Sequence, residues 1–201
     1  MRSLLALPLF LLVSCTPRDP ATRAAVRDTS TASITPPLQP ITGSALAGVR
    51  LCDALAQIVS LFPSARDTIV RGEGDSEWPS KVVQVGADGS ILFESSWVDT
   101  SHVWRISTTS PSFESRSGLR VGSRVDKLLA RGDSLEAEYA EGRLALYLPR
   151  DTVGFLIDDS SEAVFSRRFN EHDDPRRVLS PNAQIKYLVI VADCRPSKSA
   201  A

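Results

Sequence analysis

The sequence predicts an α+β fold in which two tandem repeats of a helix followed by antiparallel strands form one sheet, with the helices on one face. Three observations predict this class. Two segments about 70 residues apart resemble each other, both carry apolar residues at helical spacing, and each is followed by stretches that alternate apolar and polar residues between turn signals.

The N-terminus has the layout of an export signal. Met1 and Arg2 form a short positive start, and Leu4 to Val13 is an apolar run of ten residues. A run of this length is too short to cross a bilayer, which takes about 20 residues, but it suits a signal peptide. The sequence therefore predicts that residues 1–14 are removed on export.

The signal ends in Leu12-Val13-Ser14-Cys15, which resembles the lipobox of bacterial lipoproteins. The resemblance implies diacylglyceryl transfer to Cys15, cleavage before it, and N-acylation with a fatty acid such as palmitate. It implies a lipid-anchored protein of the cell envelope whose first partner is the membrane. Thr16, in place of an aspartate after the cysteine, favours the outer membrane where the organism has one. An ordinary signal peptide is the alternative.

The residues after the cysteine predict a flexible connection to one folded domain. Positions 16–44 contain five prolines and no aromatic residue, so they can bury too little apolar surface to fold. We therefore expect a lipidated disordered tether at 15–45 and a single α+β domain at 46–196. Its repeats are expected at about 46–112 and 113–195, and residues 197–201 are expected to be a disordered tail.

The charge balance argues against a nucleic-acid partner. Removal of residues 1–14 takes one cation from the 23 basic residues, which leaves 22 against 24 acidic residues and a formal net charge of −2. The basic residues are scattered along the chain and form no patch in the sequence. No motif predicts a cofactor or a small-molecule ligand.

The internal similarity pairs Gly48–Val59 with Gly118–Leu129 without gaps. Apolar residues fall at i, i+3 and i+4 in both segments, which predicts a short amphipathic helix in each. Asp53 and Ser123 stand just before the periodic run, where a helix N-cap is expected. These two segments begin the two predicted repeats.

Antiparallel strands are expected after the first helix. Residues 81–86, a turn at 87–89 and residues 90–98 predict a hairpin. A tight turn at Asp99–Thr100 would pair the second strand with residues 101–109. In this register one face is expected to form the core, and it carries Ile91, Phe93, Trp97, His102, Trp104 and Ile106.

Strands are also expected after the second helix. Residues 134–149 predict a hairpin about Glu141–Gly142, and residues 152–158 predict the next strand. The last strand is apolar on both faces over residues 188–191, which is typical of a central strand. Residues 160–169 leave helix and strand open, and residues 170–182 are expected to be a polar loop.

Cys52 and Cys194 are the two cysteines of the predicted domain, and they predict a disulfide because exported proteins usually pair their cysteines. Closing a loop of about 140 residues would stabilise the fold by roughly 5 kcal/mol in the chain-entropy model. Two buried free thiols are the alternative.

The remaining polar residues form no recognised catalytic or metal-binding set. His102 is predicted to be a structural imidazole beside tryptophans. His172 lies in an acidic segment that lacks the alternating ligands and glycine of a hard-cation loop. The acidic residues within 73–77 have no partner carboxylate at a defined distance, as a glycosidase would need. Trp78 is expected to pack in the core or against the linker, and an exposed contact point is the alternative.

Gly132-Asp133-Ser134-Leu135 spells the opening motif of a family of Ser-His-Asp esterases. That family places the motif after a strand and also needs a Gly-x-Asn-Asp block and a final Asp-x-x-His. Here Gly132 follows a predicted helix at 125–131, where glycine commonly ends helices, and the chain's Asp-x-x-His at 99–102 precedes the serine. We interpret this motif, and the adhesion tripeptide Arg131-Gly132-Asp133, as chance.

The two glycine-led segments, Gly48–Val59 and Gly118–Leu129, resemble the helix-plus-sheet unit of the SmpA/OmlA outer-membrane assembly lipoproteins. Two such units in tandem are similar to the β-lactamase inhibitor protein. The resemblance implies a non-catalytic envelope lipoprotein that binds or assembles with another envelope protein. One alternative is a periplasmic enzyme inhibitor with a contact loop at 71–80. Another is a hydrolase with an unrecognised site near His102 or His172.

Overall fold

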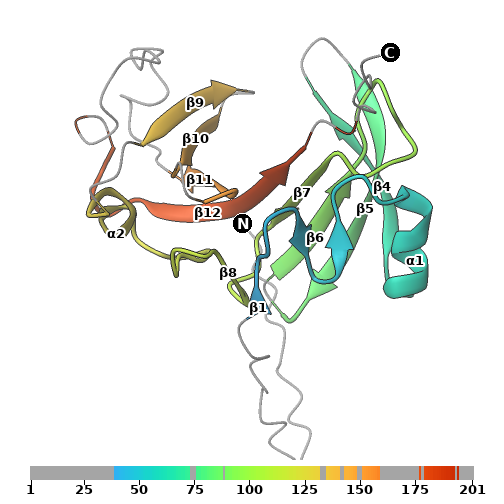
Figure 1. Cartoon of the computed structure of the whole chain (residues 1–201), viewed down its shortest axis with the longest axis horizontal. Coiled ribbons are helices and arrows are strands. Elements are labelled where there is room, and N and C mark those ends of the chain that lie inside the picture. The colour runs from blue at the N-terminus through green and yellow to red at the C-terminus, as the bar shows by residue number, and fades with distance from the viewer. Residues whose placement is uncertain are drawn as a thin grey trace, which may run out of the picture. The chain divides into compact units, whose positions relative to one another are not determined.

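An eight-stranded antiparallel sheet dominates the fold (Figure 1), in the order β4-β5-β6-β7-β12-β11-β10-β9. Each strand pairs with its neighbours in antiparallel register. The strands are β4 (Arg66–Arg71), β5 (Glu77–Val85), β6 (Gly89–Glu94), β7 (Arg105–Thr108), β9 (Glu136–Ala140), β10 (Arg143–Tyr147), β11 (Gly154–Asp158) and β12 (Gln184–Val191).

Short elements complete the fold. The strand pairs β1–β8 and β2–β3 lie outside the large sheet, and two α-helices and one 3-10 helix are a single turn each. These elements are β1 (Gln39–Pro40), β2 (Ala45–Leu46), β3 (Val49–Arg50), η1 (Leu55–Gln57), α1 (Ile58–Leu61), β8 (Phe113–Glu114) and α2 (Val125–Leu129).

The structure is a computed structural model that describes part of the chain. The described residues are 39–72, 76–87, 89–131, 135–140, 143–148, 151–158, 177, 179–192 and 194. The predicted signal peptide, Cys15, most of the tether and the tail at 197–201 lie outside them. Most of the unassigned segment 159–182 lies outside them as well.

The α+β class predicted from the sequence is wrong, because the described structure is mostly β. Short helices do form after Asp53 and Ser123, as expected: η1 and α1 cover residues 55–61, and α2 covers Val125–Leu129. They are too short to make up a helical layer. The residues before each helix form a turn in which Gly48, Cys52, Gly118 and Gly122 have φ values of 84°, 71°, 74° and 83°, outside the range of a right-handed helix.

A glycine-led turn followed by a four-stranded meander occurs twice. The first turn precedes β4–β7, the second precedes β9–β12, and the last strands β7 and β12 pair with each other. Each turn also bonds the chain near the start of the last strand of its meander, just before β7 in the first case and within β12 in the second. The Cys52 amide donates to the Val103 carbonyl at 2.7 Å, and the Gly122 amide donates to the Ile185 carbonyl at 2.8 Å.

Asp53 and Ser123 are not helix N-caps, as the sequence suggested. The N-cap positions are Ala54 for η1 and Arg124 for α2, and neither has a side-chain cap. Asp53 instead accepts a hydrogen bond from the amide three residues before it at 2.8 Å, and Ser123 accepts the equivalent bond at 3.1 Å. These bonds close the turns that precede the short helices.

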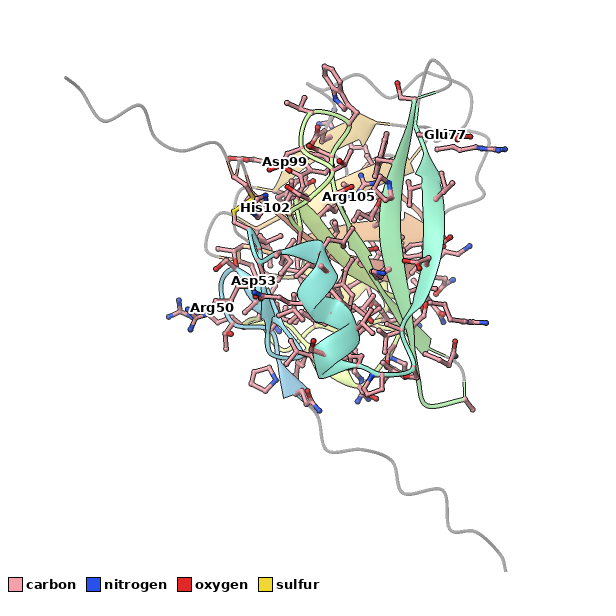
Figure 2. The ribbon with its side chains drawn as sticks, turned by 90° about the vertical axis from the view of Figure 1, so that its right-hand side faces the viewer. Arg50, Asp53, Glu77, Asp99, His102 and Arg105 are labelled. Atoms are coloured by element: carbon pink, nitrogen blue, oxygen red, sulfur yellow. A yellow bond between two sulfur atoms is a disulfide. The ribbon has the colours of Figure 1, made fainter. Side chains whose placement is uncertain are left out.

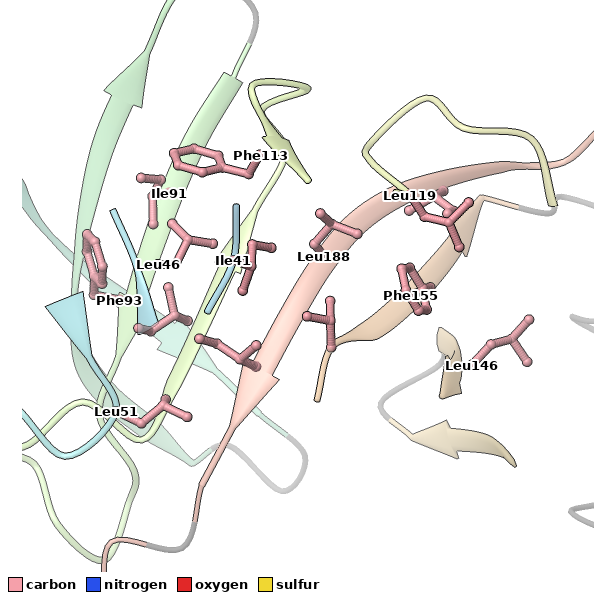
Figure 3. Close-up of a cluster of buried hydrophobic side chains, with 14 of the residues drawn as sticks. Ile41, Leu46, Leu51, Ile91, Phe93, Phe113, Leu119, Leu146, Phe155 and Leu188 are labelled. Atoms are coloured by element: carbon pink, nitrogen blue, oxygen red, sulfur yellow. The ribbon is translucent and has the colours of Figure 1, made fainter. Parts of the chain in front are cut away.

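The hydrophobic core lies on one face of the sheet (Figure 3). Phe93 pairs with Ile106 across β6 and β7, and Phe155 pairs with Leu188 across β11 and β12. Directly paired residues share a face of a sheet, and all four side chains are fully buried. The short elements contribute further members of the cluster, namely Leu46, Val49, Leu55, Ile58, Val125 and Leu128.

The predicted core face of the first meander is confirmed only in part. Three of its residues are buried: Ile91, Phe93 and Ile106. Trp97 and His102 are exposed and Trp104 is half-buried. The pairing register agrees with a turn centred on Asp99–Thr100, but the ladder ends at Glu94↔Arg105 and the residues between leave the sheet.

Other strand predictions are confirmed by the pairing registers. Ala140↔Arg143 matches the hairpin about Glu141–Gly142. The first hairpin also forms, but its turn comes one residue earlier than the expected 87–89, because Gly89 already belongs to β6 and pairs with Val85. β12 is a central strand between β7 and β11. Strand β4 was not expected from the sequence.

Candidate functional site

The segment Ser95–Trp104, called here the tryptophan loop, connects β6 to β7 and carries the candidate site. Trp97 is 74% exposed and Val98 is 68% exposed. Isolated apolar residues on a surface are ordinary, but two adjacent ones, including a tryptophan, at the tip of one loop form a small apolar contact surface. The rest of the loop determines whether this surface is held in place.

Ser96 and Asp99 fix the tip of the tryptophan loop. The Ser96 amide donates to the Asp99 carbonyl at 3.0 Å, and the Asp99 amide donates to the Ser96 hydroxyl at 2.9 Å. These two bonds close a turn around Trp97 and Val98. Because the turn is closed by its own polar groups, the two apolar side chains are directed outward without needing to pack on the domain.

The Asp99 carboxylate joins the tip to the returning half of the loop. It accepts hydrogen bonds from the Ser101 amide at 2.9 Å and the Ser101 hydroxyl at 2.6 Å. Its second oxygen lies 2.8 Å from Nδ1 of His102. Figure 2 shows the Asp99 and His102 side chains together, next to the disulfide. Ser96-x-x-Asp and Asp99-x-Ser are spacings typical of local side-chain turns, so the sequence held a signal for this loop.

Hydrogen bonding lowers the pKa of Asp99. The Ser101 hydroxyl has the largest effect, followed by the Ser101 amide and then the His102 side chain, and together they shift the pKa from 3.8 to about 2. Donors that point at a carboxylate favour its charged form. The loop therefore carries a fixed negative charge two residues from Trp97.

The disulfide holds the base of the tryptophan loop. Cys52 and Cys194 are bridged, as the sequence predicted, with their Cα atoms 5.4 Å apart and 142 residues between them in sequence. The Cys52 amide bonds the Val103 carbonyl, and the Val103 amide returns a bond to the Asp53 carbonyl at 2.8 Å. The Leu55 amide donates to the Ser101 carbonyl at 2.8 Å. The loop is thus fixed at both its tip and its base.

The serine, histidine and aspartate of this loop are not arranged as a catalytic triad. In a triad the serine and the aspartate meet opposite nitrogens of the imidazole. Here the Ser101 hydroxyl and the Asp99 carboxylate both lie at Nδ1 of His102, at 3.0 and 2.8 Å. Because Ser101 already donates to Asp99, His102 has no geometry for removing its proton. The three residues brace the loop.

A second polar cluster lies on the sheet face opposite the core. Arg105 donates to both oxygens of the buried Glu94, from Nε at 2.7 Å and from a terminal nitrogen at 2.6 Å. Ser80, directly opposite Glu94 on β5, has a buried hydroxyl without a hydrogen-bond partner. The bidentate pair is a strong charged contact, and we assign it a structural role beside the loop.

Trp78 is buried, as the packed position favoured for it in the sequence predicts, and the exposed contact point is ruled out. It lies on β5 opposite Val70 with 6% of its surface exposed. Its ring covers Gly72, where an added Cβ would meet ring carbons at 2.6 and 2.8 Å. The exposed tryptophan is Trp97 instead, and it is the residue that the sequence analysis placed in the core.

Several residues considered in the sequence lie outside the described part of the chain. These are Cys15, Glu73, Asp75, Gly132, Asp133, Ser134 and His172. Glu77 is described, and its carboxylate lies 2.6 Å from Nε of Arg71. Among the described residues, no three His, Cys, Asp or Glu side chains gather as a metal site would require.

Within the described residues, no helix has the length and apolar character needed to cross a membrane.

Comparison with known proteins supports the fold and nothing more specific. No protein-family model matches the chain, and no curated protein matches it. Among solved structures, the chain is similar to the crystal structure of the uncharacterized protein yfeY from Escherichia coli, with a TM-score of 0.55 and 9% sequence identity. The match covers 77% of this chain and 100% of that chain. At this level of identity the similarity concerns the fold alone.

Proposed function

We propose that the chain is an exported, lipid-anchored protein of the cell envelope that binds another envelope protein through the tryptophan loop. The observation that carries the proposal is the pair Trp97 and Val98, exposed on a loop whose tip and base are both fixed. A tryptophan held in a preformed position is a frequent anchor of protein interfaces, because it brings a large apolar area with little ordering cost.

Export and anchoring are supported by different residues. The disulfide between Cys52 and Cys194 is consistent with an oxidising compartment. Leu12-Val13-Ser14-Cys15 supports lipid attachment at Cys15. An anchored domain on a tether of about 30 residues can search a volume of roughly 30 Å radius for a partner. A contact loop is useful to such a protein.

The charges of the tryptophan loop favour a protein partner over a lipid surface. The loop contains no lysine or arginine, and Asp99 carries a negative charge beside the apolar tip. Loops that insert into anionic membranes usually combine apolar residues with cations. The expected partner surface is therefore an apolar pocket with a basic rim. The pocket would receive Trp97 and Val98, and the rim would contact the Asp99 carboxylate.

Photo-crosslinking in the intact envelope tests the proposal. A photoreactive amino acid at Val98 is expected to form an adduct with a single partner protein. The same adduct should disappear when Trp97→Ala is added, because the anchor side chain is lost. A photoreactive residue at Leu61, which is 55% exposed on α1, serves as the matched control and should not give that adduct. Crosslinking at Val98 that is unaffected by Trp97→Ala would contradict the proposal.

The inhibitor alternative places its contact at the loop 71–80 and takes an enzyme as the partner. In that case the activity of the enzyme falls in the presence of the wild-type chain and stays low with Trp97→Ala, because the tryptophan loop makes no contact. If His102 belongs to a hydrolase site, the His102→Ala variant should lose turnover. If His102 only stabilises the tryptophan loop, the same variant should lose partner binding. Measuring both quantities on the same variant separates these functions.

A further inference from the structure

Strand β4 forms one margin of the large sheet and offers a free backbone edge (Figure 1). Among the described residues, only β5 pairs with it. The Gly72 amide, just beyond β4, donates to the Ser76 carbonyl of the β5 side at 2.9 Å. Alternate residues of a strand point their backbone groups to opposite sides. Thr68 and Val70 therefore face β5, and Asp67, Ile69 and Arg71 direct their amides and carbonyls outward.

The side chains of Asp67, Ile69 and Arg71 lie on one face of β4, and their charge changes in a regular order along the strand. Ile69 is in the middle and 62% exposed, although it is a large aliphatic residue. Asp67 and Arg71 lie two residues to either side, with 85% and 80% of their side chains exposed. The order along the edge is thus negative, apolar, positive. Charged residues commonly keep an exposed edge from pairing with other strands. Here the two charges have opposite signs and flank Ile69 symmetrically, so a two-fold rotation at Ile69 would place each charge beside its opposite.

We infer that β4 pairs with β4 of a second copy of this chain, antiparallel and about a two-fold axis at Ile69. In this register Ile69 faces Ile69 of the second copy. Asp67 faces Arg71 of the second copy, and Arg71 faces its Asp67. The three outward residues of each copy would then exchange six backbone hydrogen bonds, the pattern of an antiparallel ladder. The eight-stranded sheets would continue into each other.

The neighbouring strand extends the complementarity. Asp67 already forms an ion pair with Lys81 on β5, and Arg71 lies 2.6 Å from Glu77 on β5. Across the inferred interface each charge row would read Glu77, Arg71, then Asp67 and Lys81 of the second copy. The signs alternate without exception along this row. Opposite charges placed directly across strands stabilise a sheet, whereas like charges destabilise it.

The two-fold register also suits the other face of the strand. Thr68 would face Val70 of the second copy, and both are β-branched residues that favour strand packing. Figure 2 shows β4 and β5 to one side of α1, with Glu77 on β5. An isologous contact of this kind closes at two copies, because each copy uses its single β4 edge.

Charge-swapped variants of the purified full chain test the inferred pairing by analytical ultracentrifugation. Wild type is expected to change from monomer to dimer as its concentration is raised, since a strand-edge interface is small and therefore weak. Asp67→Arg turns two opposite-charge contacts per dimer into two like-charge contacts, and its self-association should be about tenfold weaker or more. Arg71→Asp should be weakened in the same way. An equal mixture of the two variants should dimerise again, because each supplies the charge that the other has lost.

Proline substitution tests the backbone part of the pairing. Ile69→Pro removes an outward amide and should abolish the dimer with little change in melting temperature, since edge positions tolerate proline. Val70→Pro removes an amide that faces β5 and should lower the melting temperature of the monomer itself, which verifies the orientation of the strand. A wild-type chain that stays monomeric at the highest attainable concentration would overturn the inference. A dimer that persists in Ile69→Pro and in both single charge variants would also overturn it.

Discussion

Cys52 has a left-handed backbone conformation, and the equivalent position of the second turn is occupied by a glycine, Gly122. Its φ is 71°, and that of Gly122 is 83°. The Cys52 amide donates to Val103, just before β7, and the Gly122 amide donates to Ile185 at the start of β12. A side chain in the left-handed region costs about 1–2 kcal/mol, whereas glycine has no such cost. The first turn therefore accepts a local cost at the residue where the disulfide is formed.

Removing the Cβ at position 52 and adding one at position 122 should have opposite effects on the free energy of unfolding. Among variants that lack the disulfide, Cys52→Gly should have a free energy of unfolding about 1 kcal/mol higher than Cys52→Ala, because the two differ only in the Cβ at positive φ. Gly122→Ala should lose about 1 kcal/mol relative to wild type. No atom lies within 4 Å of a Cβ at position 122, so this loss would come from the backbone alone. Equal stabilities of the two position-52 variants in urea unfolding would contradict the argument.

At the scale of elements, the tryptophan loop derives its order from a carboxylate whose protonation can be controlled. The pKa of Asp99 is lowered from 3.8 to about 2 by donors within the loop. A carboxylate with a depressed pKa contributes its stabilisation above its unfolded pKa and loses it as the pH falls through the folded pKa. The loop is therefore fully braced above pH 4 and loses this bracing between about pH 4 and pH 2.

The titration can be followed on the indole of Trp97. Its NMR signal is expected to broaden or move toward a mobile-loop position as the pH falls from 4 to 2, before the sheet unfolds. Asp99→Asn should remove this pH dependence and give a looser loop at all pH values, because an amide cannot replace the charged acceptor of the Ser101 and His102 hydrogen bonds. A Trp97 signal that titrates identically in Asp99→Asn would show that another group controls the loop.

Some predicted elements depend only on adjacent residues, whereas others depend on backbone conformations that the sequence pattern does not show. The turns about Asp99–Thr100 and Glu141–Gly142 follow from residues next to each other, and the strand registers agree with both. The helical stripe predicts a helix after Asp53, and η1 and α1 form there. The stripe does not report that Gly48 and Cys52 adopt positive φ, so the turn before the helix could not be predicted from it.

At the scale of the whole molecule, the candidate site could not be predicted because burial depends on where each strand pairing begins and ends. Trp78 is buried since β4 pairs with β5 and brings Gly72 under its ring. Strand β4 was not predicted from the sequence. Trp97 is exposed because the β6–β7 ladder ends at Glu94↔Arg105. The disulfide could be predicted, since an exported domain with two cysteines leaves few other partners.

Lipid attachment is the property of the whole chain that the proposed function most depends on. Cys15→Ser should release the protein from membranes into the soluble envelope fraction, because several acyl chains at about 0.8 kcal/mol per buried CH₂ would be lost. Cys52→Ala is the matched control: it removes a cysteine and the disulfide but should stay with the membrane fraction. Intact-mass analysis of the wild type should show acyl modification and an N-terminus at Cys15. A wild-type protein that carries no acyl group would remove the anchor from the proposed function, while the crosslink at Val98 would still report whether the tryptophan loop binds a protein. The two parts of the proposal can therefore fail separately.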